Sequence, residues 1–312
     1  MVESGKFAEW VSAEAQALFL EHARAPVPPI DLGELRIFYD AYNRDLLAKA
    51  LELYPVTIIE TKLAGVRIHD VRPEEGVDSP STLLCLHGGG FMWGDGAGAL
   101  LEAVPVAAAA GMRVIAVDYR LAPEHVFPAA VDDVLAVYRA LLDTVEARQI
   151  GLFGCSAGAI LTCETIARIV SDELAMAGAI ALFHGAGLEF DGDSALAAQV
   201  PDPKLAQQGP GALPRMEDFP FFAGTDPADP LVLPGHHPDW LAQFPPTLLV
   251  SATRDFGASA VSVMHRRLLA AGVDASFVLF DGLWHAHHMD VGLPESRETY
   301  EITARFFRKQ LG

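Results

Sequence analysis

The chain reads Gly-Cys-Ser-Ala-Gly over residues 154–158, and this pentapeptide decides how the fold is interpreted. It joins an apolar run at 150–153, which predicts a strand, to a stretch at 157–169 with the spacing of a helix. So sharp a turn strains its central residue, and glycine on either side leaves room for it. We therefore expect the hydroxyl of Ser156 to project alone above the sheet, beside the N-terminal amides of the helix. Alone the pattern is a modest signal, since about one random chain of this length in ten contains it.

Working outward, apolar runs that predict strands recur on both sides of the pentapeptide. Those at 56–60 and 66–71 predict an antiparallel pair, and the later ones alternate with helical stretches. Such alternation predicts a parallel sheet covered on both faces. The fold class expected is α/β, with an eight-stranded, mostly parallel sheet, flanking helices and a helical cap. Further predicted strands lie at 82–86, 113–117, 150–153, 178–183, 247–250 and 275–280, and predicted helices at 129–143, 157–169, 259–271 and 294–311.

The length favours one domain over residues 1–312, with cap elements at about 1–53 and about 184–245. Residues 7–53 carry apolar side chains at broken helical spacings. The segment 184–245 is rich in Gly, Pro and Asp, and so long a segment inside a domain is usually functional. It is predicted to form a cap or pocket wall; the alternative is a surface excursion. Its apolar content is aromatic: Phe190, Phe219, Phe221, Phe222 and Trp240.

Composition and charge exclude several classes of partner. The chain is 51% hydrophobic and 20% charged, which predicts a folded protein, and its net charge of -19 repels polyanions. Nucleic acid and membranes are therefore not expected as partners. The longest apolar run, 104–117, is broken by Gly111 and Arg113, and residues 1–6 lack the features of a secretory signal. A cytoplasmic protein is the simplest interpretation.

The three cysteines give no sign of a disulfide or a metal site. Cys85, Cys155 and Cys163 lie in apolar runs without C-x-x-C spacing, so we expect buried thiols. Cys155 is also rejected as a nucleophile, because the residues two positions away, Phe153 and Ala157, are not glycine. Its side chain is expected to point into the protein.

A glycine-rich loop, His-Gly-Gly-Gly-Phe at 87–91, follows the predicted strand at 82–86. Successive glycines expose backbone N–H groups, which can receive the oxygen anion of a tetrahedral intermediate. The alternative is a flexible turn after a strand. The serine turn favours the first interpretation, because a serine hydrolase needs both parts.

A serine hydroxyl needs a base to take its proton and a carboxylate to orient that base. Chain order predicts Asp255, at the end of the segment 247–254, and His285, just beyond the strand at 275–280. Both fall at the carboxyl ends of parallel strands, where open α/β sheets place their ligands.

Nearby residues compete for these roles. His287 and His288 follow His285 closely and are expected instead in a partly exposed loop, with a metal pair less favoured than that. Asp281 competes with Asp255 but belongs to the wrong strand, and lone loop aspartates usually form turns or caps.

Four blocks resemble the hormone-sensitive-lipase-like group of α/β hydrolases, which includes bacterial esterases and lactone hydrolases. They are the loop 87–91 with Gly94, the segment 118–133 with Asp-Tyr-Arg-Leu-Ala-Pro-Glu-His, the pentapeptide, and Asp255 with His285. The resemblance implies an oxyanion hole made by the amides of Gly88, Gly89 and Ala157. It further implies a cap from the N-terminal segment and the central insertion, and a structural role for 118–133.

The chain departs from the group at two positions. Cys155 stands where an acidic residue is usual, and Ser259 where a second aspartate is frequent. These positions bear on substrate range and pH optimum. Residues 253–259 and 271–275 look closer to members similar to lactone hydrolases. The substrate pocket is expected to include Phe91, Trp93, Phe222 and Trp284.

The activity expected is hydrolysis of short- to medium-chain uncharged carboxylic esters through an acyl-enzyme intermediate on Ser156. Lactone hydrolase and amidase activity are alternatives that use the same triad. A small-molecule receptor without turnover is an alternative from another class. The triad requires no cofactor and no metal. The only partner expected besides a small-molecule ester is a second copy of the chain in a homodimer.

Overall fold

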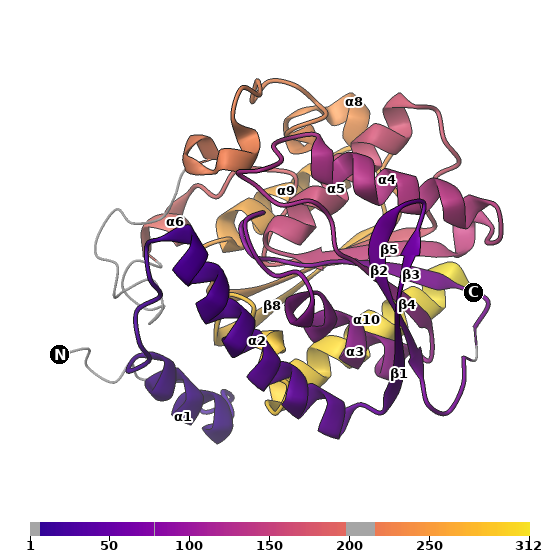
Figure 1. Ribbon diagram of the computed structural model, residues 1–312. Coiled ribbons are helices and arrows are strands. Elements are labelled where there is room, and N and C mark those ends of the chain that lie inside the picture. Colours follow the sequence, from indigo (N-terminus) through magenta and orange to yellow (C-terminus); the bar gives the residue numbers. More distant parts are fainter. Residues whose placement is uncertain (1–6, 78, 198–215) are drawn as a thin grey trace.

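The computed structural model describes residues 7–77, 79–197 and 216–312. Its centre is an eight-stranded sheet in the order β1-β2-β4-β3-β5-β6-β7-β8 (Figure 1). β2 is antiparallel to both neighbours, and the other neighbouring pairs are parallel. The predicted α/β fold and sheet are confirmed. The strands are β1 (Val56–Leu63), β2 (Val66–Pro73), β3 (Thr82–Leu86), β4 (Arg113–Val117), β5 (Ile150–Cys155), β6 (Ala179–Phe183), β7 (Thr247–Arg254) and β8 (Ala275–Trp284).

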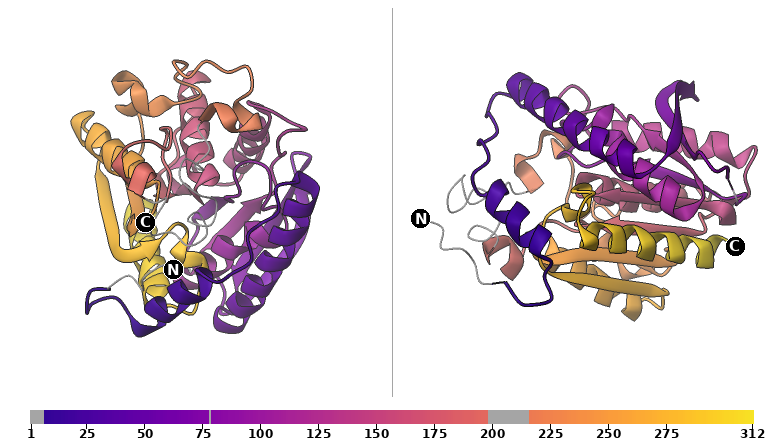
Figure 2. Two further views of the ribbon diagram at one scale, coloured as in Figure 1. Left: turned by 90° about the vertical axis from the view of Figure 1, so that its left-hand side faces the viewer. Right: turned by 90° about the horizontal axis from the view of Figure 1, so that it is seen from below.

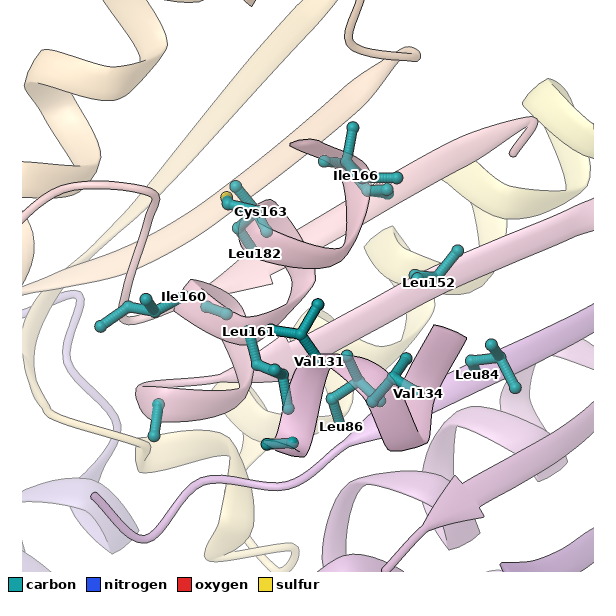
Figure 3. Close-up of a cluster of buried hydrophobic side chains, with 14 of the residues drawn as sticks. Leu84, Leu86, Val131, Val134, Leu152, Ile160, Leu161, Cys163, Ile166 and Leu182 are labelled. Atoms are coloured by element: carbon teal, nitrogen blue, oxygen red, sulfur yellow. The ribbon is translucent and has the colours of Figure 1, made fainter. Parts of the chain in front are cut away.

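Helices cover both faces of the sheet, because successive strand residues point to opposite sides. Leu84 and Leu86 of β3 belong to a cluster with α4, α5 and α9, part of which Figure 3 shows. Leu83 and Cys85 belong to a second cluster with α3 and α10. These helices are α3 (Ala97–Ala110), α4 (Ala129–Leu142), α5 (Ala157–Ser171), α9 (Ala258–Ala270) and α10 (Pro294–Leu311).

Helix α3 is absent from the predicted elements. It is buried along almost its whole length, so its sequence lacks the polar face that reveals a surface helix. The apolar run 104–117 is in fact the end of α3 followed by β4. Gly111 separates the two in a left-handed conformation, with φ +66°, that suits glycine at a helix end.

The N-terminal segment forms α1 (Ala13–His22) and α2 (Leu32–Leu53), and Figure 2 shows α2 running alongside α3. The described parts of the segment 184–245, residues 184–197 and 216–245, form short elements, and several of their residues border the candidate cavity. The expectations for residues 1–6 and 198–215 lie outside the described residues. Across the described ranges, no helix is long and apolar enough to cross a bilayer. The short elements of the segment 184–245 are α6 (Asp193–Ala197), the 3-10 turns η2 (Met216–Asp218), η3 (Pro220–Phe222) and η4 (Pro234–His236), and α8 (Pro238–Leu241). Two further 3-10 turns lie outside it, η1 (Ala147–Gln149) and η5 (His287–Met289).

Candidate active site

Ser156 lies at the turn between β5 and α5. Its backbone has φ +56° and ψ -118°, a conformation that non-glycine residues rarely adopt. A Cβ added at Gly154 or Gly158 would lie 2.3 or 1.8 Å from the backbone oxygen of Leu86 on β3. Only glycine permits this close packing, so the two flanking glycines allow the turn that raises the serine above the sheet.

Asp255 and His285 directly follow β7 and β8, both of which extend further than the sequence predicts. Nδ1 of His285 lies 2.7 Å from Oδ1 of Asp255, and the Gly257 N–H donates to the same oxygen at 2.8 Å. Burial alone would raise the pKa of Asp255. The neighbouring imidazoles of His285 and His184, which also hydrogen-bond to it, outweigh burial and hold this pKa below its usual range. The carboxylate is therefore ionised at neutral pH.

Ser156 and His285 line the same cavity. Among the described residues, no hydrogen bond joins the serine hydroxyl to the imidazole, whose Nδ1 is held by Asp255. Contacts of this kind are often long without substrate and tighten when it binds. The geometry therefore gives a formed His285–Asp255 pair and a serine facing the same space.

The glycine-rich loop borders the same cavity as His285. Gly88, Gly89 and Ala157 all line this space. In the described part of the chain, none of their three backbone N–H groups donates a hydrogen bond to the protein. Free amides that converge beside a nucleophile can receive a developing oxyanion.

The segment that begins at Asp118 holds the glycine-rich loop. The Tyr119 hydroxyl donates to the backbone oxygen of His87 at 2.6 Å, and the two rings stack with centroids 4.2 Å apart. Asp118 accepts the backbone N–H of Gly96, beyond the loop, at 3.0 Å. Burial lowers the pKa of His87, so its imidazole is neutral at pH 7. These contacts agree with a structural role for 118–133.

The cavity has a volume of about 310 Å³ and a mainly aromatic and aliphatic wall. Three of the expected pocket residues, Phe91, Trp93 and Phe222, line it. Trp284 does not and has to be removed from the pocket: it is 1% exposed, packs under α1 against Phe19 and donates to Asp290. Its position on β8 turns the indole to the far face, a consequence of the strand extending to this residue.

Several cavity residues escape sequence reasoning. Helix α2 contributes Tyr39, Tyr42 and Asn43, and Tyr39 stacks on Trp93 with ring centroids 4.8 Å apart. Nothing in the sequence of α2 links it to the serine turn. Phe256 also lines the cavity, and its position directly after the candidate acid Asp255 could have predicted this.

The competing residues lie elsewhere. His287 and His288 are fully buried, which corrects the expectation of a partly exposed loop; partners distant in sequence, Thr299 and Glu102, accompany them. Asp281 is exposed and accepts from Trp10 and Thr253, away from the imidazole of His285.

The Cys155 thiol is buried beneath the turn, and desolvation raises its pKa well above the usual value. A thiol in this state is a poor nucleophile. The location agrees with the expected inward orientation. Cys85 and Cys163 are buried as well, and all three are free thiols.

Among the described residues, two groups of side chains, all buried except the partly exposed His285, have the composition of metal ligands. In the first, His184 and His285 flank Asp255; in the second, Glu102 and His288 lie beside Cys155, and within each group the ligand atoms are within 4.8 Å of one another. In both, imidazole and carboxylate are already at hydrogen-bond distance, between 2.6 and 2.8 Å. These side chains therefore form hydrogen-bond networks, because an ion bound between an imidazole and a carboxylate would have to move the two groups apart.

Comparisons with known proteins agree with this geometry. A family model described as "alpha/beta hydrolase fold" matches residues 83–289. An acetyl-hydrolase of Streptomyces hygroscopicus is 31% identical over 234 residues, which cover 74% of this chain and 76% of that one. An esterase of Acinetobacter venetianus is 28% identical and covers 84% of this chain and 87% of its own.

Solved structures extend the likeness to the whole chain. Esterase E25 has a TM-score of 0.84 at 28% identity and covers 98% of this chain and 96% of its own. An esterase from the bacterial hormone-sensitive lipase family has a TM-score of 0.82 at 26% identity, with 96% and 99% covered. The chain therefore belongs to the α/β-hydrolase family. Within it the chain is a hormone-sensitive-lipase-like carboxylic ester hydrolase, as the four sequence blocks predict.

Proposed function

We propose that the enzyme hydrolyses short- to medium-chain uncharged carboxylic esters through an acyl-enzyme on Ser156. The observation that carries this proposal is the convergence, on one apolar cavity, of Ser156, the Asp255-bound His285 and three amides that have no acceptor within the described residues. Each part supplies one requirement of acyl transfer.

In the first step His285 Nε2 takes the Ser156 proton as the hydroxyl oxygen attacks the ester carbonyl. Asp255 holds Nδ1–H and stabilises the imidazolium. The carbonyl oxygen, now an anion, accepts from the amides of Gly88, Gly89 and Ala157. The intermediate collapses, His285 returns the proton to the departing alkoxide, and an alcohol leaves. Water then attacks the acyl-enzyme with His285 as base, and the acid is released.

The cavity supports the substrate class. A volume of about 310 Å³ is at the small end for ligand pockets. The acidic side chain on its described wall, Glu189, is paired with His236 at 2.7 Å. Uncharged acyl and alcohol groups of modest size fit such a lining. Relatives named acetyl-hydrolase and esterase are consistent with small acyl groups.

We propose further that α1, α2 and the segment 184–245 act as a cap on a single catalytic domain. Tyr39 and Tyr42 from α2, and Phe190, Phe219 and Phe222 from the later segment, enclose the cavity. Arg36 ties α2 down, since its guanidinium donates to the backbone oxygens of the loops carrying Met92 and Ala122. Cytoplasmic residence and a homodimer stay predictions, which cell fractionation and sedimentation test.

The test is Ser156→Ala assayed with p-nitrophenyl acetate, butyrate and octanoate. Loss of nearly all hydrolysis is expected, and Ser171→Ala, an exposed serine at the end of the same helix, is the matched control. Retention of more than a few per cent of the rate on butyrate by a folded Ser156→Ala protein rejects Ser156. Adding caprolactone and an anilide to the panel separates esterase from lactonase and amidase activity.

A further inference from the structure

A second imidazole binds the carboxylate that orients His285. His184 follows β6, the strand that lies between β5, which carries Ser156, and β7, which carries Asp255. Nδ1 of His184 lies 2.8 Å from Oδ2 of Asp255, the oxygen that His285 does not use. The side chain is fully buried and does not line the cavity. It therefore does not touch a bound substrate, and its hydrogen bond to the proposed triad is the one to Asp255.

With His184, every acceptor position of Asp255 is used. Oδ1 accepts from His285 Nδ1 and the Gly257 N–H, and Oδ2 accepts from His184 Nδ1 and the Ser251 hydroxyl, the last at 2.6 Å. A carboxylate offers about four acceptor sites. Two donors near Asp255 in sequence, Ser251 and Gly257, and two distant imidazoles therefore fix its plane and, through Oδ1, the ring of His285.

The backbone of His184 is held in an unusual conformation to reach this carboxylate. Its φ is +55°, a left-handed value that residues other than glycine rarely adopt. Its N–H donates to Val250 of β7 at 2.8 Å, which anchors the residue beside the acid strand. Strain held in place next to reacting groups commonly marks a functional position.

The ring of His184 is supported from behind. His288 stacks on it in a nearly parallel arrangement, with planes 6° and centroids 5.5 Å apart. Nε2 of His288 lies 2.6 Å from the buried carboxylate of Glu102 on α3. Glu102 thus fixes His288, and the flat face of His288 fixes the plane of His184.

We propose that His184 is a positioning residue: a neutral imidazole that donates Nδ1–H to Asp255 and is held in plane by the Glu102–His288 pair. The proposal rests on the proposed roles of Asp255 and His285. Nε2 of His184 is buried and has no partner in the described part of the chain, which suits the nitrogen that carries no proton. A neutral donor secures Asp255 without adding a second positive charge beside the imidazolium of His285.

The groups facing His184 agree with a neutral ring. They are Asp255, which His184 hydrogen-bonds, and the rings of His285, His287 and His288; Cys155 and Glu102 lie beside His288. Burial, opposed only in part by Asp255, lowers the pKa of His184 to about 4. Burial also keeps the pKa of His287 low and that of the Cys155 thiol high, so neither is charged at neutral pH.

Nitrogen NMR of the unaltered, histidine-labelled enzyme tests the tautomer directly. The His184 signals, assigned by their loss in His184→Asn, are expected to show Nδ1 protonated and Nε2 bare, without change between about pH 5 and pH 8. A proton on Nε2 at neutral pH, with or without one on Nδ1, overturns the proposal. This measurement is made on the unaltered enzyme and does not depend on its catalytic activity.

Kinetics of two variants test the positioning role. His184→Phe keeps a flat ring but removes the donor, and kcat on p-nitrophenyl butyrate should fall roughly 10- to 100-fold, as is common when an orienting partner is lost. KM should stay the same, because His184 does not touch the cavity. His184→Asn should restore most of kcat, since asparagine keeps an N–H donor and tolerates a left-handed backbone.

His287→Asn is the matched control: a buried imidazole beside His184 that does not hydrogen-bond to Asp255, for which kcat should stay near the unaltered value. A folded His184→Phe protein with unaltered kcat overturns the positioning role. If Ser156→Ala is inactive at the same time, the proposed function stands and only this inference fails. An active Ser156→Ala protein, in contrast, defeats the proposed function whatever the His184 variants do.

Discussion

The ring of Phe256 stacks on the imidazole of His285, with centroids 4.0 Å apart and planes inclined by 23°. Phe256 directly follows Asp255 in the chain. The turn after β7 therefore delivers a carboxylate to the edge of the imidazole and an aromatic ring to its face. Both contacts would favour the imidazolium that the proposed attack by Ser156 forms, because a carboxylate and the face of an aromatic ring both attract a cation.

Phe256→Leu should lower kcat about two- to fivefold, the equivalent of the roughly 0.5–1 kcal/mol expected of an aromatic ring over a cation. Leucine keeps an apolar side chain against the cavity but offers no π face. Steady-state rates on p-nitrophenyl butyrate measure the effect, with Phe306→Leu on α10 as a control far from the cavity. An unchanged kcat in a folded Phe256→Leu enzyme contradicts the stabilisation of the cation.

Asp255→Asn should lower kcat by roughly 10⁴, because an amide no longer fixes the tautomer of His285 or balances its charge. The pKa of Asp255 is held below its usual range, so this substitution removes a negative charge at neutral pH. The exposed Asp281→Asn is the control, assayed under identical conditions. If Asp281→Asn is inactive and Asp255→Asn is active, the acid has been assigned to the wrong residue.

Gly89→Ala should remove activity and destabilise the protein. Gly89 has φ +112°, and a Cβ there would lie 2.0 Å from the backbone oxygen of Trp93, so the glycine-rich loop must move. Gly65, in the β1–β2 turn, also has a positive φ, +85°, but nothing within 4 Å of an added Cβ. Gly65→Ala therefore reports backbone strain alone, about 1 kcal/mol, and should stay active. Comparable losses of activity in both variants would show that crowding at the loop is not the cause.

The buried carboxyl group of Glu164 on α5 should make the stability of the folded protein depend on pH. Both carboxyl oxygens are buried without a hydrogen-bond partner in the described part of the chain, and burial raises the pKa of this group well above its usual value. Below about pH 4.3 the folded and unfolded states both hold the proton. As pH rises, the unfolded state loses the proton while the folded state keeps it, so stability falls.

Glu164→Gln removes this dependence. Its advantage in unfolding free energy should grow between about pH 5 and pH 8, by at most about 1.4 kcal/mol for each pH unit. Urea unfolding at the two pH values measures it, and the exposed Glu146→Gln should show no such growth. An advantage that stays constant with pH means that the buried carboxyl does not hold its proton in the folded state.

Some of these features can be predicted from sequence, because local spacing encodes them. The glycines around Ser156 and those before Phe91 indicate positions where the backbone has a positive φ or lies very close to a neighbouring strand or loop. The order of the strands then places Asp255 and His285 at the same edge of the sheet.

Other features depend on contacts between distant parts of the chain. His288 is buried because Glu102, 186 residues away, meets it, and nothing beside either residue signals the pair. Helix α3 is enclosed and, apart from Glu102, apolar on all sides, so its sequence does not distinguish it from a strand. The prediction that Trp284 lines the pocket is wrong because β8 extends four residues beyond its predicted end. As part of the strand, the side chain is directed to one face of the sheet by the alternation of strand residues.

The position of β6 has a consequence for redesign. His184, the residue that directly follows β6, hydrogen-bonds to Oδ2 of Asp255, whereas His285 uses Oδ1. His184 does not line the cavity. A substitution there can change how firmly the reacting groups are aligned without changing the shape of the pocket. Most active-site substitutions alter kcat and substrate selectivity together. If His184 acts as a positioning residue, a substitution at this position would change kcat alone, while substitutions in the cavity wall would change selectivity.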